Sequence, residues 1–544
     1  MTNSYRFVVV DLFCGGGGFT TGFVEAFIDD HRAIIAEETG LDPADVHRTH
    51  PAVVDWLDAN LKLVAVNHWD PAVETYRTNH PYAEVYNAKV QALHPPDAVD
   101  GQRVNALIAG PSCIPHSPAK GGMASDDQKR MSPRHVAHWL DLLRPDQFLL
   151  ENVPGFRRWG PLEYPDDGGE PSMVKDGSCF EDWLRTLRTQ GYTVAHETFT
   201  AADYGDLQAR DRLFVMGRLN YEPAWPTPTH SADGAGDTEP HRPAADIIDW
   251  SDRGMSIWTR DIDHPRVHTP PAAKTLRRIA EGIRRHCDDA LDPFADVLAE
   301  LDREGIRTLR DDPVDAADLP DAATDRDEPF LVRGPAVTPA DADGRLGLCL
   351  PYVLGQHSNA VARSIEEALP TVTTSGSIGL IEPQAFVLPR DGKQRDEFSN
   401  PTYEPDDRPL HTVTANNHDG RLVSPSLVIY NGQSDVAAVD DPLPTVTATE
   451  RHALAVPDLL PWGLDIGFRM LQPPELKRAQ GFPNGYELPV DAKKRKTKLI
   501  GNAVPVALAK ALCRTLLRPT AKPTLNNYAE GPQPVADGGV ADDD

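Results

Sequence analysis

A single cysteine, Cys113, lies where an apolar run ends in a loop of small residues, AGPSCIPHSPAKGG at 109–122. A second apolar run further along the chain ends in Glu151. If the two runs are neighbouring parallel strands, the thiol and the carboxyl group emerge at one edge of a sheet. A thiolate can add to an electrophilic carbon while a carboxylic acid supplies or shares the proton. The pair therefore predicts covalent catalysis, although a lone cysteine is more commonly a small buried apolar residue.

Three further stretches carry groups suited to binding. Asp11–Gly18, DLFCGGGG, follows an apolar run and offers bare backbone at a strand-to-helix turn, although the same glycines also suit a purely structural turn. No Gly-Lys-Ser/Thr follows, which excludes a P-loop. Gln208, Arg210 and Arg212 alternate before another apolar run. In a strand this alternation places both arginines on one face. The same pattern also suits the charged, solvated start of a strand. A Gly/Pro turn at 500–505 leads into an amphipathic helix.

The elements that position these residues alternate between apolar strands and helices. This pattern predicts an α/β fold with a parallel sheet. We expect strands at 7–13, 61–70, 104–110, 146–153, 194–199 and 212–218, with helices at 136–144 and 180–191.

The composition changes after residue 217, where Pro, Asp, Thr and Gly become frequent. Within 350–455, three weak repeats share a Thr-Val-Thr core, and each follows a strand-like run. A smaller β-rich domain is therefore expected, followed by a return of helical pattern and a tail whose composition predicts disorder. The expected regions are 1–217, 218–464, 465–519 and 520–544, with the repeats at 366–374, 407–415 and 440–448.

The charge balance is strongly acidic, with 54 Lys and Arg against 82 Asp and Glu and a net charge of −28. Taken alone it argues against a nucleic-acid partner, but a lysine-poor acidic surface is also typical of proteins from a saline cytoplasm. The six cysteines form no CxxC pair and no Cys/His ligand spacing, so we expect neither disulfides nor a metal. We expect no signal peptide and no membrane-spanning stretch, and hence a cytoplasmic protein.

Taken in order, these blocks resemble the DNA (cytosine-5) methyltransferase family. The matching stretches span about 1–217 and 465–517 and bracket a variable middle. The resemblance implies a Rossmann-like S-adenosylmethionine-dependent methyltransferase fold with a mixed sheet and a target-recognition domain in 218–464. The acidic composition, taken separately, suggests a halophilic source, and a viral source is the alternative. The blocks are Asp11–Gly18, Gly110–Cys113, Glu151–Val153, Gln208–Arg212, Arg469–Pro483 with Glu475, and Gly501–Pro505.

The resemblance also implies a reaction, in which a methyl group passes from S-adenosylmethionine to C5 of a flipped cytosine in a specific duplex sequence. Cys113 would attack C6, Glu151 would act at N3, and Arg212 would hold the base from the O2 side with support from Arg210. Implied cofactor-binding residues are Asp11, Phe13, Gly15, Gly17, Gly18, His68, Pro111 and Asn502, and implied DNA-binding residues are Ser117, Lys120 and Gln208.

The implied partner is double-stranded DNA, and we expect a monomer that needs neither metal nor membrane. Whether a cognate restriction endonuclease acts beside the protein is left open. Two other readings stay open at this point, a tRNA cytosine-5 methyltransferase and a non-catalytic DNA-binding regulator. The large middle region favours duplex DNA, and the joint presence of Cys113, Glu151 and Arg212 favours catalysis.

The chain departs from the family pattern in four places. Cys113 is followed by Ile-Pro-His-Ser rather than Gln-Gly-Phe-Ser. His68 stands where the family has an acid for the ribose, and Lys89 is nearest to a second expected acid. The helical insertion 24–60 has no assigned role. The details of cofactor binding are therefore open.

Overall fold

The protein is described here by a computed structural model. It covers residues 5–111, 131–163, 172–249 and 463–518, and between 251 and 460 it covers the helices, the strands and a few residues beside them. Cys113, Ser117 and Lys120 lie outside the described residues, as do the three repeat cores and the 519–544 tail.

A seven-stranded sheet forms the larger layer, and its strands are nearly continuous apolar runs because helices cover both faces. The order is β3-β2-β1-β4-β5-β9-β8. Pairings among the first five strands are parallel, whereas β9 is antiparallel to both β5 and β8. The strands are β1 Phe7–Leu12, β2 Leu61–Asn67, β3 Ala83–Asn87, β4 Ala106–Ala109, β5 Gln147–Asn152, β8 Thr193–Thr200 and β9 Asp211–Arg218. This confirms the expected mixed α/β sheet.

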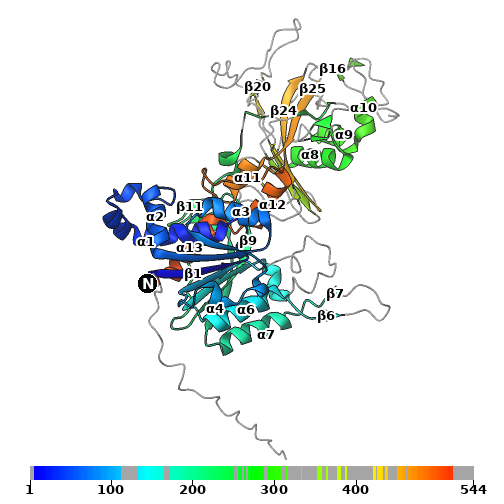
Figure 1. The fold of residues 1–544 in the computed structure, drawn as a ribbon. Coiled ribbons are helices and arrows are strands. Elements are labelled where there is room, and N and C mark those ends of the chain that lie inside the picture. Colours follow the sequence, from blue (N-terminus) through cyan, green and yellow to red (C-terminus); the bar gives the residue numbers. More distant parts are fainter. Residues whose placement is uncertain are drawn as a thin grey trace, which may run out of the picture.

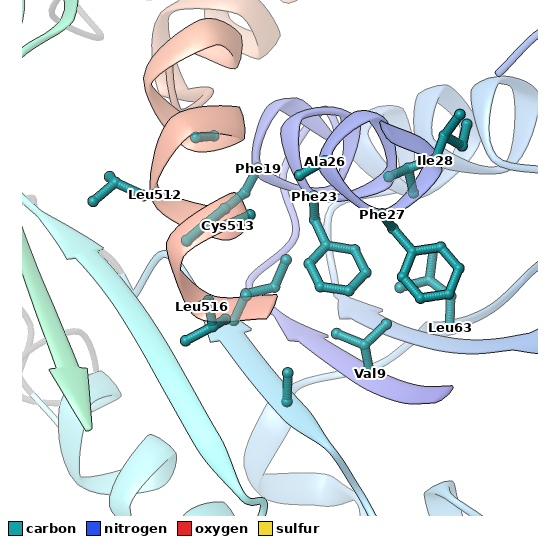
Figure 2. Close-up of a cluster of buried hydrophobic side chains, with 14 of the residues drawn as sticks. Val9, Phe19, Phe23, Ala26, Phe27, Ile28, Leu63, Leu512, Cys513 and Leu516 are labelled. Atoms are coloured by element: carbon teal, nitrogen blue, oxygen red, sulfur yellow. The ribbon is translucent and has the colours of Figure 1, made fainter. Parts of the chain in front are cut away.

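One face of this sheet is covered by α1 Gly18–Thr39, α2 Pro51–Asn60 and α13 Val506–Leu517. Figure 2 shows Phe23 and Phe27 of α1 above Val9 and Leu63, with Leu512 and Leu516 of α13 alongside. The 24–60 insertion thus supplies most of α1 and all of α2 as cover for the sheet. The opposite face is covered by α4 Pro95–Ala98, α6 Ser132–Leu143 and α7 Ser178–Thr189, with Trp139 and Trp183 in the core.

Three helices near the end of the described chain complete this layer. They are α11 Pro473–Ala479, α12 Lys493–Asn502 and α13, and α12 also contacts α3 Asp70–Asn79. Contrary to expectation, the stretch Lys493–Leu517 is long and apolar enough to span a membrane, the one such stretch among the described residues. Its apolar window is 67% buried, and α13 packs against α1, as a core helix does.

A second, eight-stranded sheet lies beyond α11 and α12, with three helices beside it (Figure 1). Its strands are β12 Met255–Ser256, β17 Tyr352–His357, β18 Arg363–Ser364, β19 Gly376–Leu380, β22 Ser426–Gly432, β23 Asp435–Ala438, β24 Glu450–Leu460 and β25 Gly463–Met470. The helices are α8 Ala273–His286, α9 Asp292–Glu300 and α10 Arg303–Thr308. The strand-like runs before the three repeats are strands β17, β20 (Phe386–Leu388) and β22.

Short strand pairs complete the described elements. They are β6 Leu162–Glu163 with β7 Ser172–Met173, β10 His230–Ser231 with β11 Glu239–Pro240, β13 Asp263–His264 with β14 Val267–His268, β15 Val314–Asp315 with β16 Val332–Arg333, and β20 with β21 Arg421–Val423.

The chain makes contacts across the expected domain boundaries. The Tyr204 hydroxyl donates to the Pro226 carbonyl at 3.0 Å, and the His241 ring lies 2.9 Å from the Asp203 carboxylate. The segment just after residue 217 therefore packs on the first layer. At the other boundary, β25 pairs with β24 of the second sheet up to Met470, beyond the expected division at 464/465.

Candidate active site

The glycine turn after β1 combines an open position with two tightly packed ones. Gly15 has φ 54°, and among the described residues a Cβ there would meet only the Phe13 carbonyl, at 3.9 Å. Gly17 has φ 85°, and a Cβ there would lie 2.4 Å from the Tyr486 hydroxyl. At Gly18 a Cβ would lie 2.5 Å from the Val504 carbonyl. Gly15 therefore leaves room beside the turn, whereas Gly17 and Gly18 allow the C-terminal segment to pack against it.

The end of β1 also holds a buried acid. Asp11 is 1% exposed and accepts hydrogen bonds from Thr20 at 2.6 Å and Tyr76 at 3.5 Å. Burial raises the pKa of its carboxyl group to about 7. Its Oδ1 has no partner among the described residues, so a ligand donor or a water molecule can satisfy it.

The neighbouring thiol, Cys14, is not suited to nucleophilic attack. It is buried, and burial, followed by the charge of Asp11, raises its pKa well above the ordinary value. A buried protonated thiol is unreactive. Cys14 is therefore not a candidate nucleophile, and Cys113 remains the predicted one.

The ends of β4 and β5 meet as the sequence predicts. The two strands are parallel neighbours, and the carboxylate of Glu151 lies 2.7 Å from Nε of Arg212. A Cβ at Gly110 would lie 3.7 Å from Oε2 of Glu151, and the Asn152 amide donates to the Pro111 carbonyl at 3.2 Å. The backbone that leads to Cys113 thus runs beside the Glu151 carboxylate.

Cys113 itself lies outside the described residues. It follows Pro111 by two positions in the sequence, and its place beside Glu151 stays a prediction.

Two other polar residues of the Gln208–Arg212 block, Gln208 and Arg210, bind the C-terminal segment. Arg210 is buried and donates to the carbonyls of Gly501 and Ala503, each at 3.1 Å. Gln208 is fully buried and donates to the Gln480 side chain at 2.7 Å. Arg212 thus pairs with Glu151 while Arg210 binds the 501–503 backbone, and the predicted support of Arg212 by Arg210 stays a prediction. Gln208 was predicted to contact DNA. Its side chain is fully buried and donates to the Ala479 carbonyl at the end of α11, so it is not accessible to DNA.

The sequence analysis missed a buried acid, Asp206, that organises the C-terminal segment. Its carboxylate accepts from the backbone N–H groups of Ala507 at 3.2 Å and Leu508 at 2.9 Å, so it caps α13. Burial raises its pKa to about 7. No local signal could have found it, because the capping residue and the helix are far apart in the sequence.

A second buried polar unit links β25 to α11. Arg469 and Glu475 are each 1% exposed and form a two-pronged pair at 3.0 and 2.9 Å. Glu475 also accepts from the backbone N–H of Asp249 at 2.9 Å. This late motif block therefore ties three segments together rather than lining the Glu151 site.

The edge formed by β2 and β3 carries exposed polar residues. His68 and Lys89 are both exposed, just beyond the ends of β2 and β3. The acid at this edge is Asp70, whose carboxylate accepts from Asn87 at 2.8 Å. Asn502 is exposed at the end of α12. Within the described ranges, no group of three or more His, Cys, Asp or Glu could hold a metal ion.

Comparison with known proteins identifies relatives of these segments. Residues 7–232 and 410–518 match the family model described as C-5 cytosine-specific DNA methylase. The type II methyltransferase M.BspRI of Lysinibacillus sphaericus is 27% identical over 235 residues, 42% of this chain and 49% of that protein. M.NlaX of Neisseria lactamica is 28% identical over 42% of this chain and 59% of its own length. M.AgeI of Thalassovita gelatinovora is 24% identical over 38% of this chain and 38% of its own length. The matched segment thus spans about half the length of these relatives.

Proposed function

Because the chain belongs to the C-5 cytosine-specific DNA methylase family, we propose that it methylates C5 of cytosine in duplex DNA, with S-adenosylmethionine as methyl donor. The observation that carries this proposal is the Glu151–Arg212 pair beside Gly110–Pro111, the segment that leads to Cys113. A carboxylate and a guanidinium so placed suit the N3 and O2 edge of a flipped cytosine.

In the proposed reaction the Cys113 thiolate forms a bond to C6 of the cytosine. The C5–C6 π electrons move toward N3 and O2, where Glu151 shares a proton with N3 and Arg212 donates to O2. C5 becomes a nucleophilic carbon. When bound, S-adenosylmethionine would supply the methyl group to C5 and would leave as the neutral thioether. Loss of the C5 proton to a base then expels the thiolate and restores the aromatic ring.

The glycine turn is the proposed place for the cofactor. Open space at Gly15, the half-buried Phe13 ring and the unpartnered Asp11 oxygen lie at one strand end. An aromatic ring can stack on adenine, and bare backbone N–H groups can approach polar ligand atoms. His68, at the end of the next strand, can donate a hydrogen bond to a ribose hydroxyl.

The region 218–464 is proposed to read the DNA sequence, because the matched chemical blocks lie outside most of it. We further propose a monomeric, cytoplasmic enzyme that belongs to a restriction-modification pair. The presence of a second sheet in this region supports the proposal, because side chains on a sheet can reach into a DNA groove.

The test is methyl transfer by the full chain. Tritiated S-adenosylmethionine is incubated with unmethylated plasmid DNA, and the product nucleosides are separated. The proposal expects labelled 5-methyldeoxycytidine at one sequence context, no label with Cys113→Ala, and no label on tRNA. Label on tRNA alone, or on no nucleic acid, would refute it.

A further inference from the structure

The exposed face of α12 carries a cluster of basic residues in this acidic chain. Its sequence begins KKRKTK at Lys493–Lys498, in a protein with a net charge of −28. Lys494, Arg495 and Lys498 are exposed, while Thr497, Leu499 and Ile500 are buried on the opposite side. Positions 494, 495 and 498 lie on one side of a helix, so the three cations form one face.

The cations on this face lack the acidic partners that other basic residues have. Arg185 pairs with Asp182 at 2.6 Å, and Arg284 pairs with Asp296 at 2.7 Å. Across the described ranges, no ion pair joins Lys494, Arg495 or Lys498 to a carboxylate. With 82 acidic residues in the chain, this local excess of positive charge is available to an external anion.

The arrangement opposes folding of the helix itself. The first turn of α12 contains no acidic residue. Cations near a helix N-terminus are unfavourable, typically by about 0.3–1 kcal/mol each. Lys494 and Lys498 also repel each other as like charges four positions apart. A charge pattern that weakens its own element indicates a ligand-binding role.

The position of α12 indicates which ligand it meets. The Leu499 carbonyl lies 3.5 Å from the Cβ position of Gly16, so α12 sits over the glycine turn. The Lys498 ammonium lies 4.4 Å from the centre of the Trp69 ring, just beyond the end of β2. α12 contacts α3 and α11, on the side of the first sheet that faces the second sheet (Figure 1).

We propose that this face of α12 contacts the phosphate backbone of duplex DNA, outside the pocket of the target base. The inference rests on the proposed function, which brings duplex DNA to this edge of the sheet. Phosphate contacts position a protein on DNA without reading its sequence, and Lys and Arg side chains supply them. α12 thereby anchors the duplex to a protein whose overall charge repels it.

The test compares two charge-matched variants of the full chain. Lys494→Gln with Arg495→Gln removes two cations from α12, and Arg185→Gln with Arg188→Gln removes two exposed cations from α7. Binding to a random 40-base-pair duplex is measured by fluorescence anisotropy at several KCl concentrations. Random sequence suffices because the proposed contact is independent of sequence.

The α12 variant is expected to bind at least tenfold more weakly at 0.1 M salt. The slope of log K against log salt should become shallower by about 1.8, that is, about 0.9 for each lost phosphate contact. The α7 variant should keep the wild-type slope. The melting temperature of the α12 variant should stay level or rise, since removing the cations relieves repulsion in the helix.

The outcomes separate this inference from the proposed function. If the wild type methylates DNA and both variants keep its slope, the α12 contact is refuted and the function stands. Tighter wild-type binding to double-stranded RNA than to DNA, lost in the α12 variant, would also refute it. If the wild type neither binds nor methylates DNA, both proposals fail.

Discussion

Arg212 and Glu151 face each other across the antiparallel pair β9 and β5, with 2.7 Å between the guanidinium Nε and a carboxylate oxygen. Their side chains are 4% and 11% exposed. A carboxylate so far removed from water needs such a partner, because breaking a buried pair costs about 3–5 kcal/mol. Arg212 therefore orients Glu151 while leaving its second oxygen toward Gly110.

Glu151→Gln should slow methyl transfer by about 10²- to 10⁴-fold, the usual contribution of a general acid or base. The amide keeps the shape of the side chain but cannot exchange a proton with N3. Single-turnover methylation measures the loss, and Glu163→Gln, on an exposed strand, serves as the control. A wild-type rate for Glu151→Gln would exclude the proton-sharing role.

Tyr486→Phe should weaken S-adenosylmethionine binding by about 5- to 100-fold with the fold retained. The Tyr486 hydroxyl donates to the Gly16 carbonyl at 2.5 Å, and losing it leaves a buried acceptor unsatisfied, at about 1–3 kcal/mol. Titration calorimetry gives the affinity, with Tyr221→Phe at the surface as the matched control. An unchanged dissociation constant would mean that Tyr486 does not support the turn.

Gly22→Ala should destabilise the protein by about 1–3 kcal/mol, as overpacking does. The added Cβ would lie 2.6 Å from the Ala509 Cβ and 2.7 Å from the Lys510 nitrogen, which forces α1 and α13 apart. Gly485→Ala is the control, because no atom lies within 4 Å of its Cβ position. Urea unfolding measures both, and equal midpoints would contradict the close packing of the two helices.

The stability contribution of Asp206 should depend on pH. Burial raises its pKa to about 7 from an ordinary value of 3.8, so the folded state holds an extra proton between these values. The contribution is therefore present at low pH and is lost as the pH rises to about 7. The wild type and Asp206→Asn each have a free energy of unfolding at a given pH. The wild-type value minus the variant value should fall by about 4 kcal/mol between pH 4 and pH 8. Urea titrations across that range measure it, and a constant difference would contradict the raised pKa.

The sequence was sufficient to predict the strand pairing beneath the candidate site, because that pairing follows from local apolar runs. Cys113 and Glu151 follow apolar runs, and the β4–β5 pairing brings the ends of those runs together as predicted. It was not sufficient for side chains whose partners lie far along the chain. Arg210 resembles Arg212 in spacing, yet its partners are carbonyls at 501 and 503, a contact set by tertiary packing.

The expected domain boundaries illustrate the same limit, because a local change of composition does not show which distant segments pack together. Composition changes at residue 217, but the chain continues to pack on the first layer because Asp203 and Tyr204 hold the segment that follows. The charge of α12 was visible in the sequence. The role proposed for this charge depends on the position of α12 above the glycine turn, and the sequence alone does not show that position.

The central claim, covalent attack by Cys113, is tested most directly with DNA in which 5-fluorocytosine replaces cytosine. Fluorine cannot leave C5 as a proton does, so the enzyme should remain bonded to C6 after methyl transfer. The wild type with S-adenosylmethionine should give a complex that survives denaturation, and peptide mapping should place the adduct on Cys113. Absence of any adduct, or an adduct on another cysteine such as the free Cys179, would contradict the mechanism.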